Sequence, residues 1–488
     1  MKIDDFIPKE EVISGNTALE VERCTSDYRQ AKEDSLLFLL PGVSFDTYSI
    51  ADKYASAKPR AIVSERTDCF VKTKVPVIRV KSARRAFAYA NYKASGLQTS
   101  KMRFIGVTGT NGKTSTATMI RRVLEDNGER VAFFGTGKIE YEDECFSDKN
   151  YSMTTPDPDI LYPMLRKMED RGATVAVMEV SSHALFLEKL APITFDVGVF
   201  TGLSHEHLDF HKNMENYLAA KEKLIANAKK GIINLDDKSG RYLYERYREK
   251  SVGIGVIYDA DLRAIEINNK GFDGLSYILR APNHTTKITL AIPGIYNVYN
   301  SLLCFAALRE FNITPKSIKD SLASIKAIDG RFEIIKRGDL SVIIDYAHTP
   351  AALDSLLKNI NTDKNIKQNI ILVFGCGGDR DQEKRPKMAQ IAKKYASKTI
   401  VTTDNSRSES PEKIINDIVS GFGGGGYGVI LDRAEAIRYA ICKADKNDIV
   451  VIAGKGHERY IQDANGFHDF DERKIIEQAL NERDEMVL

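Results

Sequence analysis

Short apolar runs alternate with stretches of helical periodicity along most of the chain, a pattern typical of parallel sheets covered by helices. The apolar runs predict buried strands at residues 104–107, 173–180, 195–200, 341–345, 369–374, 399–403 and 448–453. Helices are predicted to begin at Thr114, Pro350, Pro386, Pro411 and Arg433. The three prolines support this reading because proline suits the first turn of a helix. From residue 336 onward the alternation predicts a doubly wound, Rossmann-like sheet.

The 488 residues are enough for two to four domains at about 150 residues each. The pattern divides them into residues 1–100, 101–335 and 336–488. The first unit has short strand-like runs at 35–40 and 60–64, separated by Pro41-Gly42. The second unit is predicted to hold a mostly parallel sheet. We therefore expect an α/β protein of three domains.

Charge and composition exclude several classes of protein. The net charge of +2 lacks the basic excess of nucleic-acid-binding or membrane-surface proteins. No apolar run reaches the roughly 18 residues of a membrane-spanning helix. Acidic residues near the start do not fit a secretory signal, and the six cysteines are scattered. We expect a cytoplasmic protein with free thiols, no nucleic-acid partner and no membrane contact.

A glycine-rich turn follows the strand at 104–107 and leads into a helix. Backbone N–H groups in such a turn, at the positive end of a helix, suit a polyphosphate. Lys113 is placed to reach the β- and γ-phosphates, and the hydroxyl of Thr114 to hold Mg²⁺. The common pattern G-x-x-x-x-G-K-[ST] has a glycine where Val107 stands. The strand, the Gly-Lys-Thr triplet and the helix together still favour a site for a nucleotide triphosphate.

Acids and histidines follow the next two strands. Glu179 ends a strand beside the glycine loop, where a carboxylate holds the Mg²⁺ of the nucleotide or, alternatively, caps the following helix. His205, His207 and His211 cluster after the strand at 195–200. Their spacing matches no H-E-x-x-H helix, which disfavours an independent zinc site.

Three other positions are not assigned a catalytic or binding role by the sequence pattern alone. Composition alone makes Lys221 a solvated surface lysine. Asn297 either caps the helix that runs to Leu308 or reads an adenine edge. Arg331 belongs to a charged linker, or reaches the γ-phosphate from across a domain cleft.

Three loops of the last unit each follow a strand and should meet at one edge of its sheet. They contain Arg380, Arg407 and Glu458. Two guanidinium groups and a carboxylate suit a ligand with carboxylates and an amine, such as an amino acid. The alternative is a solvated rim.

Taken in order, these segments resemble the Mur ligases, most closely the MurE type, over the whole chain. The motifs are 106–114, 153–157, 179–183, 207–211, 217–221, 296–300, 329–333, 345–350, 377–380 and 454–458. The family also has a non-glycine where Val107 stands. The resemblance implies a small N-terminal α/β domain that binds UDP, a central P-loop ATPase domain and a C-terminal Rossmann-like domain that binds an amino acid.

The resemblance also implies an activity. MurE-type enzymes use ATP and Mg²⁺ to add the third residue to a UDP-N-acetylmuramoyl-L-Ala-D-Glu substrate, through an acyl phosphate, in peptidoglycan synthesis. Family members work mostly as monomers. The loop Asp404-Asn-Ser-Arg407 is similar to the Asp-Asn-Pro-Arg of enzymes that select meso-diaminopimelate. We therefore expect meso-diaminopimelate, with lysine as the alternative.

Matching motif positions assigns expected roles to individual residues. Catalysis is assigned to Lys113, Glu179, His207, Lys221 and Arg331. ATP binding is assigned to Gly109, Thr110, Asn111, Gly112, Lys113, Thr114, Ser115, Asn297, Arg331, Asp345 and His348. Metal binding is assigned to Thr114, Glu179, His207 and a carbamylated Lys221. The UDP-muramoyl peptide is assigned to Asp27, Tyr28, Thr154, Thr155, Ser181 and Lys189. The amino acid is assigned to Arg380, Asp404, Asn405, Arg407, Gly454 and Glu458.

Several positions depart from the family pattern. Lys189 stands where arginine is frequent, which weakens a bidentate contact. Ser406 replaces a proline, which loosens the backbone of that loop. Tyr28 and Val43 differ from the usual residues, so the uridine contacts are the least secure. A folylpolyglutamate synthetase-like ligase and an inactive nucleotide-sugar-binding protein are the competing hypotheses.

Overall fold

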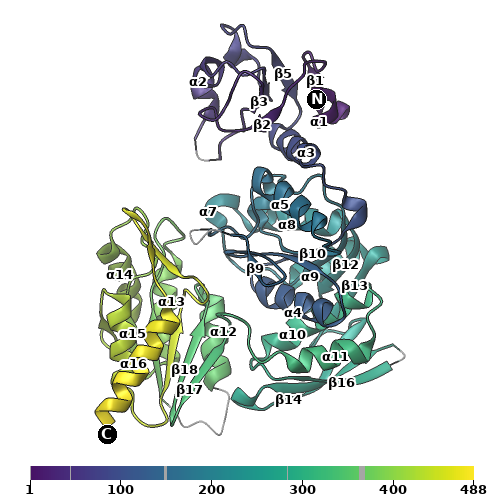
Figure 1. Ribbon diagram of the computed structural model, residues 1–488. Coiled ribbons are helices and arrows are strands. Elements are labelled where there is room, and N and C mark those ends of the chain that lie inside the picture. The colour runs from purple at the N-terminus through teal and green to yellow at the C-terminus, as the bar shows by residue number, and fades with distance from the viewer. Residues whose placement is uncertain (1, 44, 148–150, 283, 362–368, 488) are drawn as a thin grey trace.

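The computed structural model describes residues 2–43, 45–147, 151–282, 284–361 and 369–487. Three large sheets form three α/β bodies, seen in Figure 1 as an upper, a central and a lower left part. The α/β class predicted from the alternation of strands and helices is confirmed. No helix within the described residues is long and apolar enough to cross a membrane.

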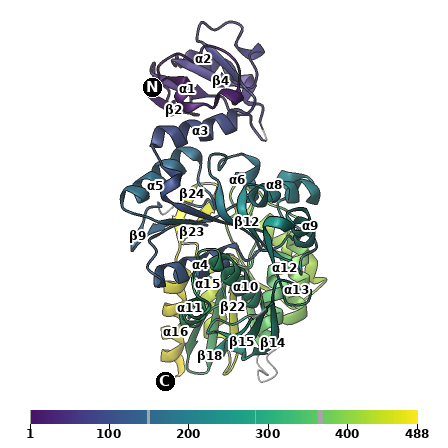
Figure 2. The same cartoon turned by 90° about the vertical axis from the view of Figure 1, so that its right-hand side faces the viewer.

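The first body contains a five-stranded sheet in the order β1-β5-β4-β3-β2. Only β1 runs antiparallel to its neighbour. Its strands are β1 (Val12–Ser14), β2 (Arg23–Thr25), β3 (Ser35–Phe38), β4 (Ala61–Ser64) and β5 (Val77–Val80). Its helices are α1 (Ile3–Phe6), α2 (Ala51–Ser56) and α3 (Ala83–Ser95). Helix α3 lies between this body and the next, as both views show (Figures 1 and 2).

The central body contains eleven strands in the order β16-β15-β14-β13-β12-β11-β6-β10-β7-β8-β9. Strands from β14 to β7 in this order pair in parallel, and hairpins extend both ends. The parallel strands are β6 (Arg103–Thr108), β7 (Val131–Gly135), β10 (Val175–Glu179), β11 (Phe195–Phe200), β12 (Ala228–Asn234), β13 (Ser251–Gly255) and β14 (Leu262–Asn269). The remaining strands are β8 (Lys138–Tyr141), β9 (Glu144–Cys145), β15 (Leu275–Ala281) and β16 (His284–Leu290).

Helices cover both faces of this central sheet, which explains why its middle strands β6, β10 and β11 are almost entirely buried. One face packs on α4 (Lys113–Asp126), α10 (Tyr296–Arg309) and α11 (Pro315–Ser324). The other packs on α5 (Pro158–Asp170), α6 (Ser182–Phe186) and α8 (Met214–Ala226). Two further helices are α7 (Leu208–His211) and α9 (Lys238–Arg246).

The third body contains a six-stranded sheet in the order β17-β18-β22-β19-β20-β21. All pairs are parallel except β17 with β18. Its strands are β17 (Glu333–Arg337), β18 (Leu340–Asp345), β19 (Ile370–Phe374), β20 (Lys398–Val401), β21 (Gly428–Val429) and β22 (Ile449–Ala453), with a separate hairpin β23 (Tyr460–Asp463) and β24 (Gly466–Asp469). Helices α12 (Pro350–Asn361), α13 (Lys384–Tyr395) and α14 (Pro411–Val419) cover one face, and α15 (Arg433–Cys442) and α16 (Glu472–Val487) the other.

Most predicted starts of helices agree with the structure. Helices α12, α14 and α15 begin at Pro350, Pro411 and Arg433. Helix α13 begins at Lys384, so the predicted start at Pro386 is wrong by two residues. The first four N–H groups of a helix have no intrahelical partner, so the missing N–H of Pro386 costs nothing at that position.

Candidate active site

The glycine loop connects β6 to α4 as the sequence predicts. Gly109 and Gly112 have φ values of +146° and +85°, which side chains rarely tolerate. A Cβ on Gly109 would lie 1.9 Å from Oγ1 of Thr201. Lys113 Nζ donates to the carbonyl oxygens of Gly109 at 3.0 Å and Thr110 at 2.9 Å, so the loop curls around the ammonium group. Val107 is a buried residue of β6, which explains why no glycine is needed there.

Glu179 lies at the carboxyl end of β10, beside β6, and is fully buried. Its carboxylate accepts hydrogen bonds from the Thr136 backbone N–H at 3.0 Å and the Thr114 hydroxyl at 2.9 Å. The cap of the following helix is Ser181, whose hydroxyl accepts from the Ala184 N–H. The reading of Glu179 as a helix cap is therefore wrong. A hydroxyl and a carboxylate at this distance are oxygen donors of the kind that Mg²⁺ prefers.

Lys221 lies on α8 and is only 1% exposed, so its reading as a solvated surface residue is wrong. Its Nζ donates to the Gly109 carbonyl at 2.8 Å and lies 4.7 Å from the centre of the Tyr217 ring. Burial, and then the charge of Lys113, lowers the pKa of Lys221 well below its ordinary value. A buried amine whose charged form is disfavoured is therefore placed against the phosphate-binding loop.

The three histidines of the cluster lie in different environments. His207 has a left-handed φ of 56°, and burial lowers its pKa to about 4, which leaves the ring neutral near pH 7. His211 Nε2 instead lies 2.9 Å from the Ser182 hydroxyl. No group of three or more His, Cys, Asp or Glu suited to a metal occurs in the part of the chain that is described. Of the three histidines, His205 and His207 line the large cavity described below.

Arg331 comes from the segment between the second and third sheets and reaches the glycine loop. Its Nη2 donates to the Thr114 hydroxyl at 2.9 Å. Asp345, at the end of β18, is buried and accepts from the N–H groups of Phe332 at 2.7 Å and Ala347 at 2.8 Å. Burial raises the pKa of Asp345. The linker segment is thus folded against both bodies.

A cavity of about 390 Å³ lies beside the glycine loop. Its lining includes Asn111, Ser115, Arg331, Asp345 and His348, all expected at an ATP site. Asn297 is not part of that lining. Its side chain donates to the Pro293 carbonyl at 2.6 Å, and Ile295 is the N-cap of α10, so the reading of Asn297 as the cap is wrong.

Asn300, rather than Asn297, lines this cavity, and the sequence analysis did not identify it. Asn300 lines it and donates to the Asn297 side-chain oxygen at 2.9 Å. Asp236 and Tyr299 also line it, joined by a hydrogen bond of 2.9 Å. The motif Tyr-Asn-x-x-Asn contains both asparagines, and a helix places positions three apart on one face, so the signal was present.

A larger cavity of about 500 Å³ is lined by residues of the central and third bodies. Its lining includes Lys113, Thr114, Glu179 and all six residues assigned to the amino acid: Arg380, Asp404, Asn405, Arg407, Gly454 and Glu458. The three loops therefore meet at one sheet edge, as predicted from the fact that each follows a strand.

A buried lysine organises these loops, and the sequence did not indicate it. Lys455 is fully buried and donates to the side chains of Asn405 and Glu458, both at 3.1 Å. Asn405 in turn donates to Glu458 at 3.0 Å. Burial alone would raise the pKa of Asp404, but the charges of Lys455 and Arg433 hold it at about 2. Asp404 is therefore an anion at neutral pH.

The residues assigned to the muramoyl peptide separate into two groups. Thr154 lines the large cavity, and Thr155 lies next to it, donating to the Glu179 carbonyl at 2.9 Å and accepting from the Ser181 N–H at 3.0 Å. Lys189 forms an ion pair of 2.7 Å with Asp157. Asp27 and Tyr28 belong to the first body and line neither cavity. Asp27 binds the Arg29 guanidinium, and Tyr28 contacts the Tyr54 ring.

Comparisons with known proteins agree with this architecture. The Mur ligase middle domain matches residues 107–308, and the Mur ligase glutamate ligase domain matches residues 330–456. The chain is 37% identical over 480 residues to a UDP-N-acetylmuramoyl-L-alanyl-D-glutamate–2,6-diaminopimelate ligase of Bacillus licheniformis, covering 96% of each chain. It is 36% identical to such an enzyme of Clostridium acetobutylicum, covering 97% of this chain and 98% of the relative.

A solved structure of a UDP-N-acetylmuramoyl-L-alanyl-D-glutamate–2,6-diaminopimelate ligase shares the fold. It has 27% sequence identity and a TM-score of 0.69, with 99% of both chains covered. The expected three-domain architecture is thus confirmed by a structure that aligns over almost every residue. The chain belongs to the Mur ligase family.

Proposed function

We propose that this protein is an ATP-dependent ligase that joins meso-diaminopimelate to UDP-N-acetylmuramoyl-L-alanyl-D-glutamate. One observation carries the proposal: a single cavity is lined by the phosphate-binding loop and by the loops that bear Arg380 and Arg407. A carboxylate activated at the first can therefore meet an amine held at the second without leaving the cavity.

Activation begins with the terminal carboxylate of the muramoyl peptide. One of its oxygens attacks the γ-phosphorus of ATP, the bond to the β–γ bridging oxygen breaks, and ADP leaves. Lys113 and the Arg331 guanidinium offset the negative charge that gathers between the two anions. The smaller cavity, with Asn300 and Asp345, receives the nucleoside. Thr154, Thr155, Ser181 and Lys189 hold the muramoyl peptide, whose uridine end reaches Asp27 and Tyr28.

Thr114 and Glu179 fit a magnesium site, since both present oxygen at hydrogen-bond distance of one another. A bound Mg²⁺ supplies positive charge to the phosphate oxygens. His207, neutral near pH 7, offers a ring nitrogen. Lys221 completes the set as a carbamate: its uncharged amine attacks CO₂, loses a proton and becomes an anion. The low pKa of this buried lysine favours the reactive amine.

Amide formation follows in the same cavity. The amine of the incoming amino acid attacks the acyl carbon, and the bond to the phosphate oxygen breaks, releasing inorganic phosphate. Asp404, Asn405 and Glu458 surround the amine and the near carboxylate, together with the Gly454 backbone. Arg407 and Arg380 are left to bind a distal carboxylate, which diaminopimelate has and lysine lacks.

A panel of amino acids tests this proposal. Purified protein is given ATP, Mg²⁺ and UDP-N-acetylmuramoyl-L-alanyl-D-glutamate, and phosphate release is measured with meso-diaminopimelate, lysine and glutamate. We expect turnover with meso-diaminopimelate. With lysine, kcat/KM should be lower by at least about 100-fold, because Arg407 is left unpaired.

The outcomes separate the candidate functions. Absence of phosphate release with every amino acid would exclude a ligase. Preference for lysine would retain the ligase and exclude the assigned amino acid. Turnover of a folate substrate, with none of the muramoyl peptide, would favour the folylpolyglutamate synthetase-like alternative.

A further inference from the structure

Arg380 and Arg407, both assigned above to one distal carboxylate, repel each other before the ligand arrives. Burial, and then the charge of Arg407, lowers the pKa of Arg380. Both lie on loops, and the serine at 406 gives the second loop no stiffening ring. Something else in the protein has to hold the two guanidinium groups side by side.

The two loops are joined by several hydrogen bonds. The Gly378 N–H donates to the Asn405 carbonyl at 2.9 Å, and Arg407 Nη1 donates to the Gly378 carbonyl at 2.8 Å. Ser408 donates from its hydroxyl and its N–H to the Asp379 carboxylate, at 2.7 and 3.1 Å. Asp379 and Arg407 both have a φ of 52°, a conformation that persists only where its surroundings enforce it.

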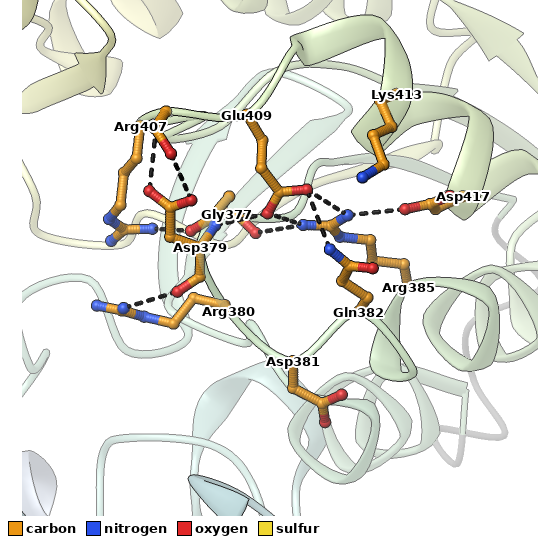
Figure 3. Close-up of polar contacts among 12 residues, drawn as sticks. Gly377, Asp379, Arg380, Asp381, Gln382, Arg385, Arg407, Glu409, Lys413 and Asp417 are labelled. Carbon is orange, nitrogen blue, oxygen red and sulfur yellow. Dashed lines mark hydrogen bonds and ion pairs between the residues drawn. The ribbon is translucent and has the colours of Figure 1, made fainter. Parts of the chain in front are cut away.

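An ion pair between a buried arginine and a half-buried glutamate lies beside this junction (Figure 3). Arg385, at the start of α13, has a fully buried side chain. It donates to both carboxylate oxygens of Glu409, at 2.8 and 3.1 Å, and to the Gly377 carbonyl at 3.3 Å. The same carboxylate accepts from the Asp379 N–H at 2.6 Å. Glu409 therefore connects the loop of Arg407, two residues away, to the residue that precedes Arg380.

Resting on the proposed function, we infer that Arg385 and Glu409 are positioning residues that determine the preference for a diamino acid with a distal carboxylate. The pair touches no reacting atom. It fixes the separation of Arg380 and Arg407, and so replaces the stiffness that a proline at 406 would supply. Loss of the pair leaves both arginines present but no longer aimed together.

The chain offers a matched control for this pair. Asp417 on α14 binds the same Arg385 guanidinium at 2.7 Å. Within the described residues its carboxylate makes no hydrogen bond to residues 377–382. Asp417→Asn therefore weakens an ion pair of Arg385 and leaves the junction of the two loops intact, whereas Glu409→Gln removes the charge that joins them.

Steady-state kinetics with each substrate varied in turn provides the first test. Glu409→Gln is expected to raise KM for meso-diaminopimelate roughly tenfold, the effect of losing a charge-assisted hydrogen bond. KM for ATP and kcat should stay within about twofold, and the preference over lysine should fall by the same tenfold factor. Asp417→Asn should resemble the wild type. An equal rise in KM for ATP, or the same rise in Asp417→Asn, would overturn the inference.

Hydrogen–deuterium exchange of the ligand-free protein provides a readout that does not depend on activity. The segments 377–382 and 404–409 should exchange faster in Glu409→Gln than in wild type or Asp417→Asn. Ser408→Ala, which removes one bond to Asp379, should show a smaller change of the same sign and serves if Glu409→Gln does not fold. Unchanged exchange in the folded variants would overturn the inference. A wild type without turnover would refute the proposed function alone.

Discussion

Lys113→Met should lower kcat about 1,000-fold, the upper range for loss of one group that stabilises charge in a transition state. The ammonium group is held by the carbonyl oxygens of Gly109 and Thr110, so it lies where the phosphates meet the loop. Methionine fills similar space without the charge. Rapid-quench measurement of ADP formation in a single turnover reports this step directly.

The control for Lys113→Met is the unfolding temperature. Burial lowers the pKa of Lys113, so loss of its charge should not destabilise the fold, and the unfolding temperature should stay within a few degrees of wild type. A folded variant with kcat within threefold of wild type would remove Lys113 from the assigned role.

Lys221→Ala should lower kcat by at least about 100-fold. Alanine cannot form the carbamate, and the proposed magnesium site loses an anion. Added bicarbonate should not restore activity because the side chain has no amine. The carbamate itself is visible by ¹³C NMR after growth or incubation with labelled bicarbonate, as a signal present in wild type and absent from the variant.

Lys223→Ala is the matched control, because Lys223 lies on the same helix and donates to a backbone carbonyl, that of Leu185, at 3.3 Å. It should keep both the activity and the NMR signal. Full activity of Lys221→Ala, or a carbamate signal that survives in it, would show that Lys221 does not act as proposed.

Much of the fold could be predicted because strand and helix signals are local. The strand at 195–200 is confirmed to the residue, and that at 173–180 shortens to Val175–Glu179 because a turn precedes it. The order of strands within each sheet could not be read from the sequence. Strand β22 lies between β18 and β19, although it is the last strand of that sheet in the chain.

The environments of side chains were less predictable than the positions of helices and strands. Lys221 has neighbours typical of a surface helix, and its burial arises from contact with Gly109, more than 100 residues earlier. Lys455 and Arg385 are buried cations whose partners come from other loops. Such pairs depend on tertiary contacts and leave no periodic signal. The roles assigned to the site residues are predictions, and the variants described above test them.

The large cavity has two walls that come from different sheets. Lys113 follows β6 and Glu179 ends β10 of the central sheet, whereas Arg380 and Arg407 follow strands of the third. On the proposed assignment, Lys113 and Glu179 serve the phosphate chemistry, whereas the loops of Arg380 and Arg407 select the amino acid. Substitutions confined to these two loops can then alter which amino acid enters a cell wall while the groups that contact the phosphates stay the same, so the chemistry of the cross-links can change without loss of the ATP site.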